Sequence, residues 1–268
     1  MSKGSRNRQQ ARQKIAKMRA LEARRRRRRN WMAGIAAAAV VIAAVVGVTL
    51  AATRSGGSSP AAAGSSSPAA GGSPRLKLSS LAALGRLHPP GQPGPTGPEG
   101  VPVPSAPPLA STAAAATGKD VDGIRCQTSE QTIFHIHAHL TIFVNGSPRQ
   151  VPAGIGIPGA QAQNTPQGPF ISSGTCFYWL HTHAVDGIIH IESPVQRTYT
   201  LGNLFDEWGQ PLGPDQMGPA AGPVTAIYNA RRYQGNPRDI PLNAHAQIQL
   251  EVGRPLVAPL TITFPSGI

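Results

Sequence analysis

Residues 132–144, TIFHIHAHLTIFV, decide the fold of the second half of the chain. In an extended strand, successive side chains point to opposite faces. Every even-numbered position from 134 to 144 is apolar, and we expect these side chains to face a core. The odd-numbered positions include His135, His137 and His139, so three imidazoles project from the other face at intervals of about 6.7 Å. Asn145-Gly146, which is typical of two-residue hairpin turns, ends the stretch.

Further strand patterns follow along residues 120–268. Gly and Pro separate short apolar or alternating runs at 176–183, 187–192, 224–229, 246–252 and 260–264. Only residues 200–208 have a helical pattern, with Thr200 as N-cap and Gly209 just past the end. The sequence therefore predicts one mainly β domain over 120–268, a β-sandwich or barrel with one short helix.

A second histidine cluster surrounds Asp186-Gly187, another hairpin dipeptide. If these two residues form the turn, His183 lies opposite His190 and His181 lies opposite Glu192, all on one face. Where this face approaches the strand of residues 132–144, three or four imidazoles can converge on a metal ion at about 2.0–2.1 Å. The alternative is a solvent-facing row of histidines that binds no metal.

Sites rich in imidazole and poor in carboxylate suit zinc, copper or nickel rather than calcium or magnesium. We therefore predict a transition-metal site, zinc or copper, with ligands drawn from His135, His137, His139, His181, His183 and His190. Glu192 is a candidate proton acceptor, or a partner that orients a ligand. We leave out His245, because its strand offers it no partner histidine, and His88, because it falls in the linker.

The chain has two cysteines, Cys126 and Cys176. An even number in an oxidising compartment predicts one disulfide between them. A catalytic cysteine is the weaker alternative, since a lone thiol outside the cell would be oxidised.

Residues 31–52 form an apolar run of 22 residues without a charge, long enough to cross a hydrocarbon core of about 30 Å. Six arginines, residues 24–29, directly precede it. Because positive charge stays on the cytoplasmic side, we expect a single-pass cell-membrane anchor with the N-terminus inside and the β domain extracytoplasmic. A cleaved signal peptide is the alternative, but the basic region and the apolar run are both longer than usual.

The net charge of +13 is concentrated in one tail. Residues 1–30 carry 13 of the 25 Lys and Arg side chains and one of the 12 acidic ones, whereas residues 120–268 carry 7 basic and 10 acidic side chains. The folded domain is therefore not expected to bind nucleic acid. We expect residues 1–30 to be a cytoplasmic tail that orients the anchor or lies on anionic lipid.

Residues 53–119 separate the anchor from the domain, and 51 of these 67 residues are Pro, Gly, Ala, Ser or Thr. Such a segment buries too little apolar surface to offset the entropy of ordering it. The composition therefore predicts a disordered linker that holds the domain away from the membrane.

Several motifs together resemble a family of exported, histidine-rich bacterial and archaeal proteins: FHIHAHLTIFVNG (134–146), VPAGIGI (151–157), FYWLHTH (177–183), DGIIHIESP (186–194) and YTLGNLFDEWGQPL (199–212). The resemblance covers about residues 124–268 and implies an exported domain, but it brings no established activity. Phe-His-Ile-His at 134–137 is also similar to His-x-His strands of copper/zinc superoxide dismutases and α-type carbonic anhydrases. The bridging-histidine loop of the former and the Thr-Glu pair of the latter are missing, and the cupin motif spacing is not reproduced.

Three functions remain open at this point. The histidine pattern favours a domain that binds or handles a transition metal. A metal-dependent enzyme is the second, with Glu192 or a non-ligating histidine moving protons. A cell-envelope structural or interaction domain is the third. Glycine-rich phosphate loops, Gly-x-Ser-x-Gly and His-Glu-x-x-His are missing, so common nucleotide-binding and hydrolase motifs give no support to other classes.

Overall fold

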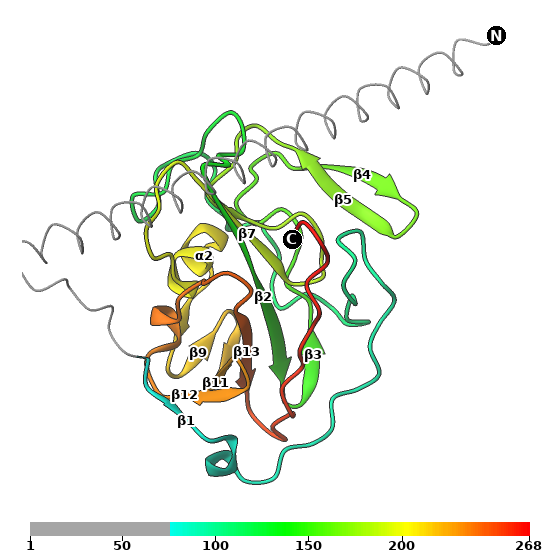
Figure 1. Ribbon diagram of the computed structural model, residues 1–268, viewed down its shortest axis with the longest axis vertical. Coiled ribbons are helices and arrows are strands. Elements are labelled where there is room, and N and C mark those ends of the chain that lie inside the picture. Colours follow the sequence, from blue (N-terminus) through cyan, green and yellow to red (C-terminus); the bar gives the residue numbers. More distant parts are fainter. Residues whose placement is uncertain (1–75) are drawn as a thin grey trace, which may run out of the picture. The chain divides into compact units, whose positions relative to one another are not determined.

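The computed structural model describes residues 76–268, and within them the chain is mainly β with one α-helix (Figure 1). The main sheet has eight strands in the order β1-β12-β11-β13-β2-β7-β6, with β3 paired to β2 off this path. Its strands are β1 (Leu78–Ser79), β2 (Phe134–Val144), β3 (Ser147–Arg149), β6 (Leu180–His181), β7 (Ile188–Ser193), β11 (Val224–Tyr228), β12 (Arg231–Tyr233) and β13 (Gln247–Val252). The path ends at β1 and β6, so the described sheet is open and does not close into a barrel.

Two small sheets and three helical segments complete the described fold. The small sheets consist of β4 (Gln161–Thr165) with β5 (Gly168–Ser173), and of β8 (Leu212–Gly213), β9 (Gln216–Met217) and β10 (Ala220–Ala221). The helical segments are α2 (Leu201–Trp208) and the 3-10 turns η1 (Leu81–Leu84) and η2 (Pro237–Asp239). The predicted helix is confirmed: Thr200 precedes α2, and Gly209 ends it in the left-handed conformation at φ 68°.

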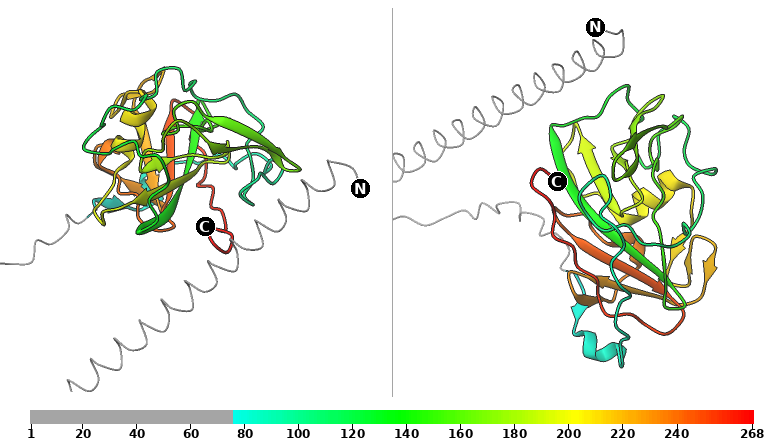
Figure 2. Two further views of the ribbon diagram at one scale, coloured as in Figure 1. Left: turned by 90° about the horizontal axis from the view of Figure 1, so that it is seen from above. Right: turned by 90° about the vertical axis from the view of Figure 1, so that its right-hand side faces the viewer.

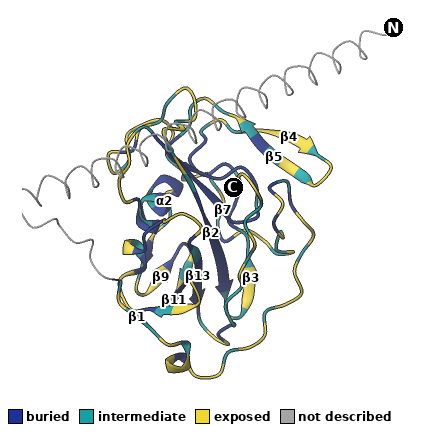
Figure 3. Cartoon of the chain, viewed as in Figure 1, coloured by how far each residue is buried: buried dark blue, intermediate teal, exposed yellow. Residues whose placement is uncertain are grey.

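Strand β2 lies between β13, which runs parallel to it, and β7, which runs antiparallel. Its even-numbered side chains Ala138, Leu140 and Ile142 belong to the main hydrophobic core, together with Leu204 and Phe205 of α2. The predicted core face is therefore confirmed. From His137 to Phe143 the opposite face is buried as well, as Figure 3 shows for most of β2, so the histidines do not form a solvent-facing row, although His135 is exposed.

The chain after β13 lies along the polar face of the sheet, on the side opposite α2 (Figure 2). Gln249 accepts a hydrogen bond from the Leu260 N–H and donates one to the Val257 carbonyl, and Gln247 makes the same pair of bonds with Ile262. The predicted strand at 260–264 is therefore wrong. Two glutamine amides, which carry both a donor and an acceptor, bind this segment in place of a neighbouring backbone.

The two predicted hairpins have different outcomes. Asn145-Gly146 joins β2 to β3 as expected, with Val144 opposite Ser147 and both turn residues at positive φ. Asp186-Gly187 does not form a two-residue turn, because His181, not His183, lies opposite His190. The Gly187 carbonyl accepts a hydrogen bond from the Leu140 N–H at 2.9 Å, so Gly187 extends the pairing of β7 with β2. The loop that connects β6 to β7 is therefore longer than two residues.

The second half of the predicted linker belongs to the folded domain. Leu78 in β1 pairs with Tyr233, Leu84 packs on Ile227, and Val101 and Leu109 are buried. These few apolar side chains hardly change the average composition of residues 53–119. They are spread along the segment, and each packs on the domain, so the Pro-rich chain between them is held against it. The prediction of disorder is therefore wrong for residues 76–119, whose course Figure 1 shows in cyan and green.

The predicted tail, anchor and first part of the linker, residues 1–75, lie outside the described residues. In the part of the chain that is described, no helix is long and apolar enough to cross a membrane.

Cys126 and Cys176 form the expected disulfide, with their Cα atoms 5.4 Å apart. The adjacent residues Gln127 and Phe177 exchange backbone hydrogen bonds of 2.9 and 2.7 Å. The disulfide therefore ties the segment that leads into β2 to the segment that leads into β6.

Candidate metal centre

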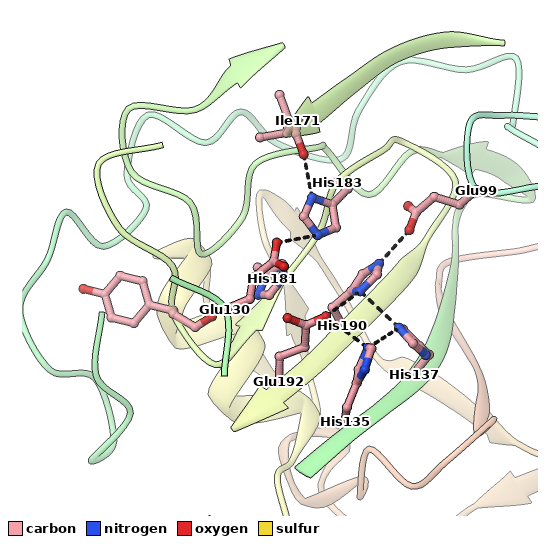
Figure 4. Close-up of polar contacts among 10 residues, drawn as sticks. Glu99, Glu130, His135, His137, Ile171, His181, His183, His190 and Glu192 are labelled. Atoms are coloured by element: carbon pink, nitrogen blue, oxygen red, sulfur yellow. Dashed lines mark hydrogen bonds and ion pairs between the residues drawn. The ribbon is translucent and has the colours of Figure 1, made fainter. Parts of the chain in front are cut away.

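The histidines meet because three neighbouring strands place them in one row. His137 of β2 lies opposite His190 of β7, and His190 lies opposite His181 of β6. One step along the same face, His135 lies opposite Glu192. Since the side-chain period of a strand is two, all these groups project from the polar face of the sheet (Figure 4).

Four of these side chains surround one point, and we call them the first group: His135, His137, His190 and Glu192. His135 Nε2 lies 3.1 Å from His137 Nε2 and 3.0 Å from Glu192 Oε1, and His190 Nδ1 lies 3.1 Å from His137 Nε2 and 3.5 Å from Glu192 Oε1. Ligand bonds of 2.0–2.1 Å give a tetrahedron with edges of about 3.3–3.4 Å. The four distances are close to these edges.

His181 and His183 offer their Nε2 atoms to the same cluster. Each ring donates its Nδ1–H to a backbone carbonyl, His181 to Tyr178 at 2.9 Å and His183 to Ile171 at 2.5 Å. A carbonyl can only accept, so the remaining ring nitrogen of each neutral histidine carries a lone pair. His183 Nε2 lies 3.6 Å from Glu130 Oε1, whereas His181 Nε2 is buried and has no hydrogen-bond partner within residues 76–268.

Glu99 and Glu130 are functional candidates that the sequence analysis missed. Glu99 lies at the tip of a turn. In this turn the Gly97 N–H donates to the Val101 carbonyl and the Val103 N–H donates to the Pro95 carbonyl. The Oε1 atom of Glu99 is 2.6 Å from His190 Nε2. Nothing in the local sequence singles out either residue. Both residues lie on segments that have no strand or helix pattern.

The imidazoles of His137, His181 and His183 are held neutral. Burial and the neighbouring His190 lower the pKa of His137 to about 3, and the same two causes hold the pKa of His181 well below its usual range. Burial, followed by His190, also lowers the pKa of His183. Neutral imidazoles keep the lone pairs that a metal ion requires.

His190 and Glu192 form the charged part of the site. Burial lowers the pKa of His190, but hydrogen bonds to Glu192 and Glu99 outweigh it and raise this pKa to about 9. Burial would raise the pKa of Glu192, yet hydrogen bonds from His135 and His190 hold it well below its usual range. Without a metal, a cationic His190 between two carboxylates accounts for the contacts of His190 with Glu99 and Glu192. It does not account for the buried, partnerless Nε2 of His181.

His139 does not join the cluster, although it was predicted to. Its Nε2 donates to the Asp186 carbonyl at 2.9 Å, and its neighbour across the strands is Ile188 rather than a histidine. The His245 side chain also stays out of the cluster, although its backbone N–H donates to the His137 carbonyl at 2.7 Å: its ring stacks on Phe264 and its Nε2 is 3.0 Å from the Ile268 carbonyl oxygen.

The cluster reaches solvent on one side. About a third of the side-chain surface of His135 and of Glu130 is exposed (36% and 38%), whereas His183, His190 and Glu192 are at most 10% exposed. An ion can therefore approach past His135 and Glu130.

Comparison with protein-family models, with curated proteins and with solved structures found no match to this chain. The resemblance to exported histidine-rich proteins stays a prediction.

Proposed function

We propose that the β domain binds a divalent transition-metal ion, zinc or copper, through the first group. The observation that carries the proposal is the set of four contacts of 3.0–3.5 Å among three imidazole nitrogens and one carboxylate oxygen. Three imidazoles with one carboxylate are a donor set that zinc and copper prefer, and calcium and magnesium do not.

The surroundings of the first group support this function. Glu99 holds Nε2 of His190, so the ring can turn Nδ1 toward the ion, as in the carboxylate–histidine–metal arrangement common in zinc proteins. Glu99, Glu130 and Glu192 contribute carboxylates around the cluster, and no Lys or Arg of residues 76–268 forms an ion pair with them. The electrostatic environment therefore favours a cation.

We further propose that residues 31–52 anchor the protein in the membrane, with residues 1–30 in the cytoplasm and the β domain outside. The hydropathy and arginine pattern supports this topology. The Cys126–Cys176 disulfide supports it as well, because disulfides persist in oxidising compartments. In this arrangement the domain stores, senses or delivers its metal at the outer face of the membrane.

Zinc titration of the metal-free full chain in detergent tests the function. We expect a dissociation constant in the micromolar range or below. At a hundredfold excess of zinc over that constant, the free energy of unfolding should rise by about 2.7 kcal/mol. Calcium and magnesium at the same concentrations should leave the unfolding transition unchanged. If neither zinc nor copper binds at micromolar concentration, the proposal is wrong.

Metal affinity should increase with pH between about 7 and 9. His190, with its pKa of about 9, is protonated on both nitrogens at pH 7, and it must lose the Nδ1 proton before it can bind an ion. Each ion should therefore release about one proton, and affinity should rise about tenfold per pH unit until His190 is neutral. His137, with a pKa of about 3, contributes nothing in this range.

Calorimetric titrations in buffers of different ionisation enthalpy measure this proton release directly. Affinity that is constant from pH 7 to 9, with no proton released, would show that His190 is not a ligand.

A further inference from the structure

Half of the cluster remains unused when one ion binds the first group. His181, His183 and Glu130 form a second set beside the first group, which we call the second group (Figure 4). His181 lies within 4.8 Å of His183 and His190 in one set of potential ligand atoms, and within 4.8 Å of Glu130 and Glu192 in another. None of the three side chains of the second group belongs to the first group.

The two histidines of the second group are prepared as ligands. The Tyr178 and Ile171 carbonyls fix their Nδ1–H atoms, so each presents an Nε2 lone pair to the cluster. His181 is fully buried, and its Nε2 has no partner among the described residues. An unpaired buried acceptor is unfavourable, and a bound cation removes that cost.

Glu192 connects the two groups. Its Oε1 contacts His135 Nε2 and His190 Nδ1, whereas its Oε2 is buried without a hydrogen-bond partner in the described part of the chain. A Glu192 carboxylate oxygen also lies within 4.8 Å of potential ligand atoms of His181 and Glu130. A carboxylate with one oxygen used and the other free can bridge two cations.

We propose that the cluster is a two-metal centre, in which a second zinc or copper ion binds His181, His183 and Glu130 and the Glu192 carboxylate lies between the two ions. This inference rests on the proposed function, because it adds an ion to the site described there. Glu99, Glu130 and Glu192 would offset most of the charge of two dications. With the shared Glu192, the second ion also has four protein ligands, of which Glu130 is partly exposed to solvent.

Zinc stoichiometry of the full chain tests the inference. The protein in detergent is saturated with zinc chloride, freed of unbound zinc by gel filtration and analysed for metal content. We expect two ions per chain for the wild type, one for His183→Ala, and two for His245→Ala, an exposed histidine outside the cluster. One ion in the wild type overturns the second site and leaves the proposed function standing. No ion in the wild type overturns both.

Electron paramagnetic resonance of the copper-loaded wild type provides a measurement that needs no variant. Two copper(II) ions that share a carboxylate are magnetically coupled. We expect a normal copper(II) spectrum below one equivalent and a coupled, weaker spectrum per copper at two equivalents. Two uncoupled signals at two equivalents would overturn the bridging role of Glu192.

Discussion

Replacing His190 with alanine should lower zinc affinity by at least a hundredfold. His190 supplies Nδ1 to the first group, and its other nitrogen contacts Glu99, so the ring is surrounded by ligands and their partners. Loss of a residue that only orients a ligand typically costs 10–100-fold in metal affinity, so loss of the ligand itself should cost about a hundredfold or more. Isothermal titration of the full-length variant measures the effect.

The metal-free protein should also lose stability in His190→Ala. The variant leaves Glu99 and Glu192 buried without the imidazolium between them, and breaking a buried ion pair typically costs about 3–5 kcal/mol. Urea unfolding of the metal-free variant measures this loss.

Two matched variants separate the roles. Glu99→Gln keeps the size of the side chain and an acceptor for His190, so we expect a smaller loss of 10–100-fold in affinity. His245→Ala should bind zinc as the wild type does. A His190→Ala protein that stays folded and keeps its affinity within threefold would remove His190 from the ligand set.

The convergence of the histidines could be predicted because a register error of two residues does not change which face of a strand a side chain occupies. The predicted pairing of His183 with His190 was off by two residues, and a shift of two leaves every side chain on its original face. The rows of β2, β7 and β6 therefore still meet on the polar face. The exclusion of His139 could not be predicted, because it depends on the register between β2 and β7, which places Ile188 opposite it.

Glu99 and Glu130 could not be predicted, because they reach the site through long-range packing. Glu99 is 91 residues from His190 in the sequence and lies in a segment dominated by Pro and Gly. Its position depends on a short turn and on the buried Val101 beside it. Periodic patterns in the sequence indicate strands and helices, so they cannot indicate a site residue that lies on an irregular segment.

Removing the disulfide should destabilise the domain by about 4 kcal/mol. Cys126 and Cys176 are 50 residues apart, and a closed loop of that length reduces the entropy of the unfolded chain by this amount in the chain-entropy estimate. For a domain of this size, the melting temperature of Cys126→Ser/Cys176→Ser should fall by about 8–16 °C. Differential scanning calorimetry of metal-free wild type and variant measures the difference.

The same variant should lose the second metal ion before the first. Cys126 begins the segment that carries Glu130, and Cys176 begins the segment that carries His181 and His183, so the disulfide holds together the two parts of the second group. The first group lies on β2 and β7, which pair over six residues without help from the disulfide. We expect zinc content to fall from two toward one per chain under conditions in which the variant remains folded. Reduction of the wild type should reproduce both effects, and a change in unfolding free energy below about 1 kcal/mol would contradict the first.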